Sequence, residues 1–101
     1  MISSALLTRF QTGRLFAAPA ALAALAAPLE HNITPLSLLT HHVSGDFGHI
    51  SHADRQANEH VIEHGGRILS RYQLEPGSAL WVWVITEADR PSTCMLMPDD
   101  Y

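Results

Sequence analysis

The stretch LWVWVITEA, from Leu80 to Ala88, constrains the fold more than any other part of the chain. Successive side chains of an extended strand point to opposite faces of a sheet. One alternating set here is aliphatic: Leu80, Val82 and Val84. The other is aromatic or aliphatic: Trp81, Trp83 and Ile85. Because both faces are apolar, the segment is predicted to lie in the middle of a sheet with both sides at least partly covered.

Three other segments are predicted to be strands. RILSRYQL precedes the apolar stretch, and EPGS joins the two with proline and glycine in the central positions of a type II turn. TCMLM follows after the turn DRPS. A first strand is expected over Phe10–Ala18, with Gly13 at a bulge or a close approach.

The region between the first strand and the others predicts three helices. Pro19 suits a first helical turn and is followed by AALAALAA, a run of strong helix formers. A second helix is expected from the N-cap Thr34 and Pro35 to Gly45. Its apolar residues, spaced roughly as in a helix, are Leu36, Leu39 and Val43.

The third helix has the clearest start, because Ser51 with Asp54 three residues later resembles a capping box. Gly65 and Gly66 are expected to end it. At about 100° per residue, its apolar stripe would contain Ala53, Ala57 and Val61.

These elements predict an α+β fold in the order β-α-α-α-β-β-β, with the helices on one face of a small, mainly antiparallel sheet. A length of 101 residues fits one domain, residues 1–101, in which residues 1–9 could form a loosely ordered N-terminal segment. The apolar run between Pro19 and Pro28 is too short to span a membrane. Arg9, Arg14 and the absence of acidic residues before Glu30 leave a transit peptide open.

Charge and cysteine content narrow the classes of function. The net charge is −4 and all six basic residues are arginines, which argues against a nucleic-acid binder that neutralises many phosphates. A single cysteine, Cys94, excludes an intrachain disulfide and favours a cytoplasmic protein. No sequence motif indicates a cofactor.

The segment HVIEH matches the reversed zinc-peptidase motif H-x-x-E-H. That interpretation makes His60 and His64 zinc ligands and Glu63 the base, and it needs a third ligand and a position for water. The expected helix places both histidines on or beside its buried stripe and ends directly after His64. A simpler alternative is that His64 caps the last carbonyl groups.

A second histidine pair, His49 and His52, has the spacing H-x-x-H and lies near His41 and His42. These side chains are candidates for a structural or incidental metal site. The alternative is that they are polar surface or core-edge groups that make stability depend on pH.

The polar segment TEADRPST, residues 86–93, directly follows the predicted central strand. As a hairpin turn, it would have Asp89 bonding backbone amides and Arg90 pairing with an acid. Alternatively, Arg90 joins Arg67 and Arg71, and with Tyr72 or nearby hydroxyl groups these arginines bind a phosphate or an acidic partner.

The topology, with GRILSRY and WVWVITEADR, resembles the RelE/ParE toxin superfamily, whose RelE branch cleaves messenger RNA on the ribosome. The resemblance implies a small ribonuclease using the positions Arg67, Arg71, Tyr72 and Arg90. This chain departs from the pattern in having no lysine, a negative charge and shorter helices.

A resemblance covering more of the chain rests on LLTHHVSGDFG, ANEHVIEHGGRILSRY and VWVITEADRPSTCMLMPDDY. These segments are similar to a family of small uncharacterised, plasmid-related proteins of proteobacterial mobile elements. Its specific parts are Gly45–Gly48 and ITEADR. The resemblance implies a bacterial, mobile-element origin and supplies no activity.

The sequence therefore favours a non-enzymatic accessory protein that binds another protein or a second copy of itself, with a counter-defence role such as anti-restriction or anti-CRISPR. Aromatic residues and methionine are common interface anchors, and Trp81, Trp83, Tyr72 and Met97 supply them here. The alternatives are a RelE-like ribonuclease and a histidine-based metal-binding protein. The expected binding residues are Arg67, Arg71, Tyr72, Trp81, Trp83, Glu87, Asp89 and Arg90.

Overall fold

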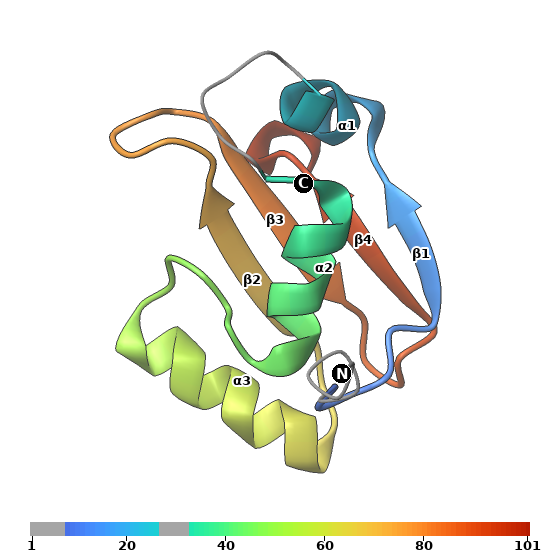
Figure 1. The fold of residues 1–101 in the computed structure, drawn as a ribbon. Helices are drawn as coiled ribbons and strands as arrows, with labels where there is room; N and C mark the ends of the chain where they lie inside the picture. The colour runs from blue at the N-terminus through green and yellow to red at the C-terminus, as the bar shows by residue number, and fades with distance from the viewer. Residues whose placement is uncertain (1–7, 27–32) are drawn as a thin grey trace, which may run out of the picture.

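A computed structural model describes residues 8–26 and 33–101 of the chain (Figure 1). The order β-α-α-α-β-β-β and the α+β class predicted from the sequence are confirmed. The elements are β1 (Arg14–Ala17), α1 (Pro19–Ala26), α2 (Pro35–Ser44), α3 (His52–His64), β2 (Ile68–Gln73), β3 (Trp81–Thr86), β4 (Ser92–Leu96) and a short 3-10 helix, η2 (Pro98–Asp100).

The described residues form one mixed sheet with the strand order β1-β4-β3-β2. β3 is antiparallel to both of its neighbours, and β1 joins the far side of β4 in parallel. The first strand is shorter than the predicted Phe10–Ala18. The chain at Gly13 has a positive φ of 64° and passes so close to the β3–β4 turn that a Cβ would lie 2.3 Å from the Arg90 carbonyl oxygen.

The core lies between the sheet and the first two helices (Figure 1). Val82 and Val84 of β3 are completely buried on this side, as the alternating pattern predicted. Trp81 and Trp83 point to the opposite side and are half-buried. The remaining buried members of the core cluster are Ala21, Leu25, Leu38, Tyr72, Leu74 and Met95.

Helix α2 begins and ends as predicted. Thr34 accepts a hydrogen bond from the Ser37 amide, and Gly45 closes the helix in the left-handed conformation. The predicted apolar stripe was partly wrong, because Leu36 is 70% exposed. The buried positions are Leu38, His42 and Val43. A histidine takes a position facing the sheet, so apolar spacing alone gave the wrong rotation of this helix.

Helix α3 has the predicted N-cap Ser51 and C-cap Gly65. Its predicted buried stripe was wrong, because Ala53 and Ala57 are exposed. Within α3, all of which the structure describes, Asn58 is the one fully buried residue. The reason is that α3 lies beside the edge of β2 and contacts it through an amide side chain, so it does not need an apolar face over the core.

Asn58 hydrogen-bonds the outer edge of β2 as a neighbouring strand would. Its Nδ2 donates to the Leu69 carbonyl oxygen at 2.8 Å, and its Oδ1 accepts from the Leu69 amide at 3.2 Å. The loop after α2 continues this pattern at Arg71, whose amide donates to Phe47 O and whose carbonyl accepts from His49 N. The Gln73 amide donates to Nδ1 of His49 at 3.3 Å. The outward amides of Leu69, Arg71 and Gln73 and the outward carbonyls of Leu69 and Arg71 are therefore paired.

Within the segment Gly45–Gly48, Gly48 makes this close approach to β2 possible. A Cβ at Gly48, where φ is +76°, would lie 2.3 Å from the Arg71 carbonyl oxygen. Between the glycines, Phe47 is completely buried. The segment therefore has a structural role, because it attaches the end of α2 to β2.

The predicted loose segment, residues 1–9, lies mostly outside the described residues. Arg9 is described and held at two points: its amide donates to the Val43 carbonyl oxygen, and its guanidinium pairs with Glu59 of α3 at 2.8 and 2.5 Å.

Replacing Asn58 with alanine should lower the free energy of unfolding by about 2 kcal/mol, because it leaves a partly buried amide and carbonyl of Leu69 unpaired. Urea denaturation would measure the change, with the exposed Gln56→Ala of the same helix as control. An equal, small effect in both variants would contradict the edge-pairing role of Asn58.

Candidate protein-binding surfaces

The HVIEH motif lies on the exposed side of α3. His60 and His64 are both exposed, and their rings are 4.5 Å apart. The prediction that they lie on or beside a buried stripe was wrong, because Asn58 directs the opposite side of the helix toward the sheet. His64 Nε2 lies 3.7 Å from Glu63 Oε2.

The other histidines are dispersed. His41 pairs with Asp46 at 3.0 Å, His49 packs edge-on against Trp81, and His52 begins α3. Within residues 8–26 and 33–101, no three His, Cys, Asp or Glu side chains are close enough together to hold one metal ion.

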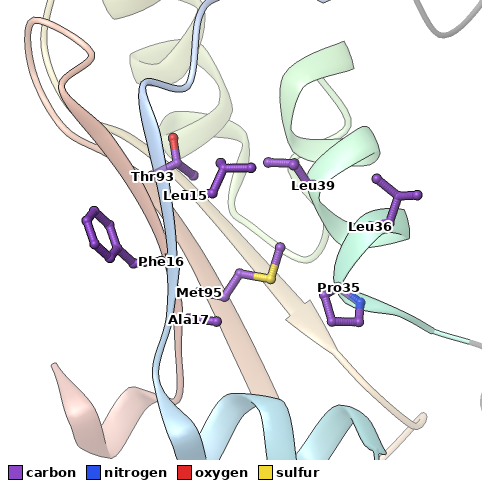
Figure 2. A pocket seen from close by; sticks show the side chains of 8 residues that line it. All are labelled: Leu15, Phe16, Ala17, Pro35, Leu36, Leu39, Thr93 and Met95. Carbon is purple, nitrogen blue, oxygen red and sulfur yellow. The ribbon is translucent and has the colours of Figure 1, made fainter.

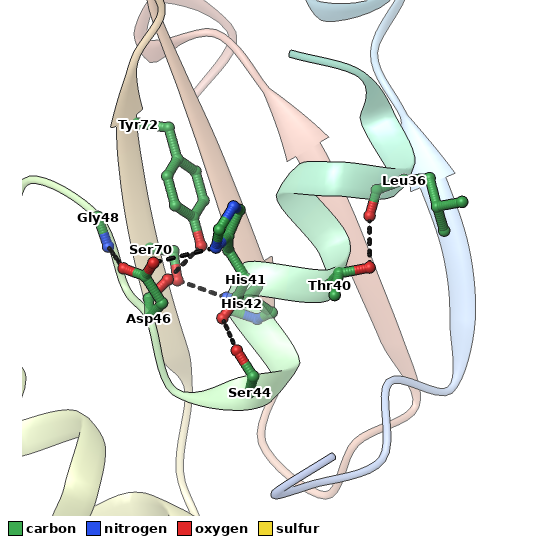
Figure 3. Close-up of polar contacts among 9 residues, drawn as sticks. All are labelled: Leu36, Thr40, His41, His42, Ser44, Asp46, Gly48, Ser70 and Tyr72. Atoms are coloured by element: carbon green, nitrogen blue, oxygen red, sulfur yellow. Dashed lines mark hydrogen bonds and ion pairs between the residues drawn. The ribbon is translucent and has the colours of Figure 1, made fainter. Parts of the chain in front are cut away.

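His42 is the one of these histidines that the fold buries completely. Its Nδ1 is 2.6 Å from Ser70 Oγ of β2, and its Nε2 is 2.8 Å from Thr86 Oγ1 of β3 (Figure 3 shows the Ser70 contact). Thr86 Oγ1 is 2.7 Å from Thr93 Oγ1 of β4, which donates to the Thr12 carbonyl oxygen at 2.8 Å. This chain of hydrogen bonds links α2 to three strands and to the segment before β1.

The last acceptor fixes the direction of the hydrogen bonds from Thr93 back to His42 Nε2. A carbonyl oxygen only accepts, so the hydroxyl hydrogen of Thr93 is committed to Thr12 and Thr86 must donate to Thr93. Thr86 then accepts from the Nε2–H of His42. Burial lowers the pKa of the imidazole to about 4, so the ring is neutral at pH 7 and its Nδ1 accepts from the Ser70 hydroxyl. Ser70, Thr86 and His42 have no exposed surface, so the Ser–His contact is structural and no substrate reaches it.

The residues of the segment ITEADR also have structural roles. Glu87 pairs with Arg67 at 3.2 Å, and Asp89 and Arg90 both have positive φ in the turn before β4. The predicted pairing of Arg90 with an acid was wrong. Its guanidinium donates to the carbonyl oxygens of Gly66 and Val61 at 2.6 and 2.9 Å. Arg90 therefore caps the C-terminus of α3, the role expected of His64.

The four residues proposed for a ribonuclease are not brought together. Tyr72 points to the helix-covered face of the sheet, where burial raises the pKa of its phenol and its hydroxyl donates to the Asp46 carbonyl oxygen at 2.7 Å (Figure 3). Arg71 points to the opposite face, and Arg90 caps α3. Arg67 pairs with Glu87 and donates to the Tyr101 hydroxyl.

Three of the predicted binding residues do meet, on the face of the sheet opposite α1 and α2. Arg71 places its guanidinium 4.9 Å from the centre of the Trp83 ring, and Trp81 lies on the same face. With His49 and Pro98 they line a hollow of about 270 Å³. We call Arg71, Trp81 and Trp83 the aromatic–arginine face. Tyr72 and Arg90 are not part of it.

The Arg71 guanidinium keeps capacity to bind a further acceptor. Its Nη1 lies 3.8 Å from Asp54 Oδ2, and both side chains are more than a third exposed, so this ion pair contributes little. Its Nε is buried and has no partner among the described residues, so an outside acceptor would bind the terminal Nη groups of this partly exposed side chain. An arginine stacked on tryptophan is the kind of side-chain pair found at the centre of protein interfaces.

A second surface was not predicted from the sequence. An apolar groove of about 310 Å³ runs between β1 and α2, and Figure 2 shows Leu15, Ala17 and Met95 pointing toward α2 while Phe16 points away. The lining residues are Leu15, Phe16, Ala17, Pro35, Leu36, Leu39, Thr93 and Met95. Leu15 and Phe16 are 56% and 53% exposed. Sequence patterns contain no signal for this groove, because it forms where β1 and α2, distant in sequence, lie side by side.

Comparison with models of known protein families, with curated proteins and with solved structures finds no match for this chain. Within the part of the chain that the structure describes, no helix has both the length and the apolar character needed to cross a membrane.

Stability should fall as the pH falls from 6.5 to about 4, because the unfolded chain then binds a proton at His42 that the folded chain does not. The lost free energy should be about 3 kcal/mol over this window. Urea denaturation at several pH values would measure it. His42→Gln should be less stable at neutral pH but should flatten this dependence, whereas the exposed His52→Gln should keep it. Parallel pH curves for wild type and His42→Gln would contradict the assignment.

Proposed function

We propose that this chain is a non-enzymatic accessory protein of a mobile genetic element, and that it binds another protein through its aromatic–arginine face. The observation that carries the proposal is the Arg71 guanidinium stacked on Trp83, beside Trp81, on a sheet face that α1 and α2 leave uncovered. Tryptophan, tyrosine and arginine dominate the binding energy of protein interfaces.

The polar groups that suggested catalysis have other roles, which supports binding over chemistry. His42 holds α2 on the sheet, Arg90 caps α3, and the Tyr72 phenol is buried. The segments behind the resemblance to plasmid-related proteins, Gly45–Gly48 and ITEADR, form a loop and a turn. The resemblance therefore bears on the origin of the chain, and we extend it to a counter-defence role in the bacterial cytoplasm, against a restriction or CRISPR complex.

The partner should present an acidic side chain next to an apolar one. A carboxylate can take two donors from the Arg71 guanidinium, while an apolar group fills the hollow between Trp81, Trp83 and Pro98. His49 at the border packs edge-on against Trp81 and limits the size of that group.

Affinity capture from bacterial lysate, quantified by mass spectrometry, should identify this partner. Wild type and Arg55→Gln should retain it, because Arg55 lies on α3 near Phe47 and away from the hollow. Arg71→Gln and Trp81→Ala should each lose it by at least about tenfold, as expected for truncating a residue that dominates an interface. Equal retention by all four proteins would contradict a role for this face.

The counter-defence role predicts a phenotype in cells. Expression of the wild-type chain should raise the transformation efficiency of unmodified DNA into a host that has a restriction or CRISPR system, and Arg71→Gln should not.

A separate incubation of the purified chain with RNA should leave the RNA intact. RNA cleavage lost in both Arg67→Ala and Arg90→Ala would overturn the binding function in favour of a ribonuclease.

A further inference from the structure

We propose that two copies of this chain associate through β1, edge to edge, to form a continuous sheet across a twofold axis. β1 is the edge of the sheet that the described residues leave open. The amides of Arg14 and Ala18 face β4, donating to Pro91 O at 3.0 Å and to Met95 O at 2.8 Å. The peptide groups of Leu15 and Ala17 consequently face outward, and within residues 8–26 and 33–101 nothing hydrogen-bonds them.

The two edges of the sheet are treated differently by this fold. On β2 the outward amide and carbonyl groups of Leu69 and Arg71 and the amide of Gln73 are paired by Asn58 and by the loop after α2. Proteins commonly protect an exposed edge with charge, proline or a covering element, because an unpaired edge is a template for another strand. On β1, the residues whose peptide groups face outward are leucine and alanine, and their side chains do not prevent pairing with another strand.

The sequence of β1 fits pairing with itself. In an antiparallel pair centred on Phe16, Leu15 of one copy lies opposite Ala17 of the other. Both are hydrogen-bonded positions, so the outward amide and carbonyl groups of Leu15 and Ala17 in both copies find partners. Arg14 of one copy lies opposite Ala18 of the other, so the two arginines are at opposite ends of the ribbon and do not repel each other closely.

Side-chain size favours a second copy as the occupant of the groove. Leu15 and Ala17 point to the same side of the sheet as α2 (Figure 2). Leucine from the second copy would lie beside the small Ala17, where the groove of about 310 Å³ is open toward Pro35 and Leu36. Twofold symmetry fills both grooves at once and brings the exposed Phe16 side chains together on the opposite side.

Charge also favours a second copy. No residue that lines the groove carries a charge, so the contact opposes no like charges although each chain carries −4 overall. A foreign peptide added to a four-residue strand would gain the same few hydrogen bonds and fill only one groove. The pairing leaves both aromatic–arginine faces on the same side of the joined sheet, but it does not depend on their function.

Analytical ultracentrifugation from micromolar to submillimolar concentration should show a monomer–dimer equilibrium. Leu15→Asp should shift it to monomer, because a charge enters an apolar contact. Leu22→Asp, at a similarly exposed leucine on α1 that does not line the groove, should leave it unchanged. Circular dichroism should verify that both variants are folded.

A disulfide would test the register directly. In the proposed pair the Cα atoms of the two Phe16 residues are about 4.5 Å apart, within disulfide reach. Phe16→Cys combined with Cys94→Ser should form a covalent dimer on mild oxidation, and Leu22→Cys with Cys94→Ser should not. The replacement of Cys94 is needed because it is paired with Phe16 on β4.

A monomer at every concentration would overturn the proposal and leave the edge to an extended segment of another protein. So would a dimer that survives Leu15→Asp, or one in which Phe16→Cys does not cross-link, since either result places the contact elsewhere.

Discussion

Hydrogen bonding to the outer backbone of β2 is the constraint on which the rest of this structure depends. A strand at the border of a sheet has donors and acceptors that must find partners or remain in water. Here Asn58 and the Gly45–His49 loop supply those partners, which fixes α3 beside β2 and the end of α2 above it. The face of the sheet opposite α1 and α2 is left partly exposed, and β1 becomes the open border.

The buried chain from Ser70 through His42 to Thr12 connects the same elements through side chains. A buried polar chain is stable only when each member is paired. Here the Thr12 carbonyl oxygen, which can only accept, sets the donor direction from Thr93 back to His42 Nε2. The groups most suggestive of chemistry, a histidine beside a serine, are thereby used for structure. The functions that we propose therefore rest on surfaces, namely the aromatic–arginine face and the edge of β1.

Sequence patterns predicted the elements well where the signal was local. The alternation in β3, the caps Thr34, Gly45 and Ser51, and the Glu75–Ser78 turn all depend on neighbouring residues, and the structure agrees with them. Predictions failed where a partner distant in the sequence determines which side of a helix is buried or which group a side chain binds. Which side of α3 is buried depends on the Leu69 backbone, and Arg90 is recruited by carbonyl groups more than 20 residues away. Side-chain periodicity contains no information about either partner.

Backbone amides at the unpaired edge, β1, should exchange with solvent faster than those at the paired edge, β2. Amide hydrogen exchange followed by NMR therefore tests the account most directly. In dilute protein the amides of Leu69, Arg71 and Gln73 should exchange slowly, and those of Leu15 and Ala17 quickly. As the concentration rises, Leu15 and Ala17 should become protected while the β2 amides stay unchanged. Rapid exchange along β2, or protection of Leu15 and Ala17 that is equally strong in dilute protein, would contradict it.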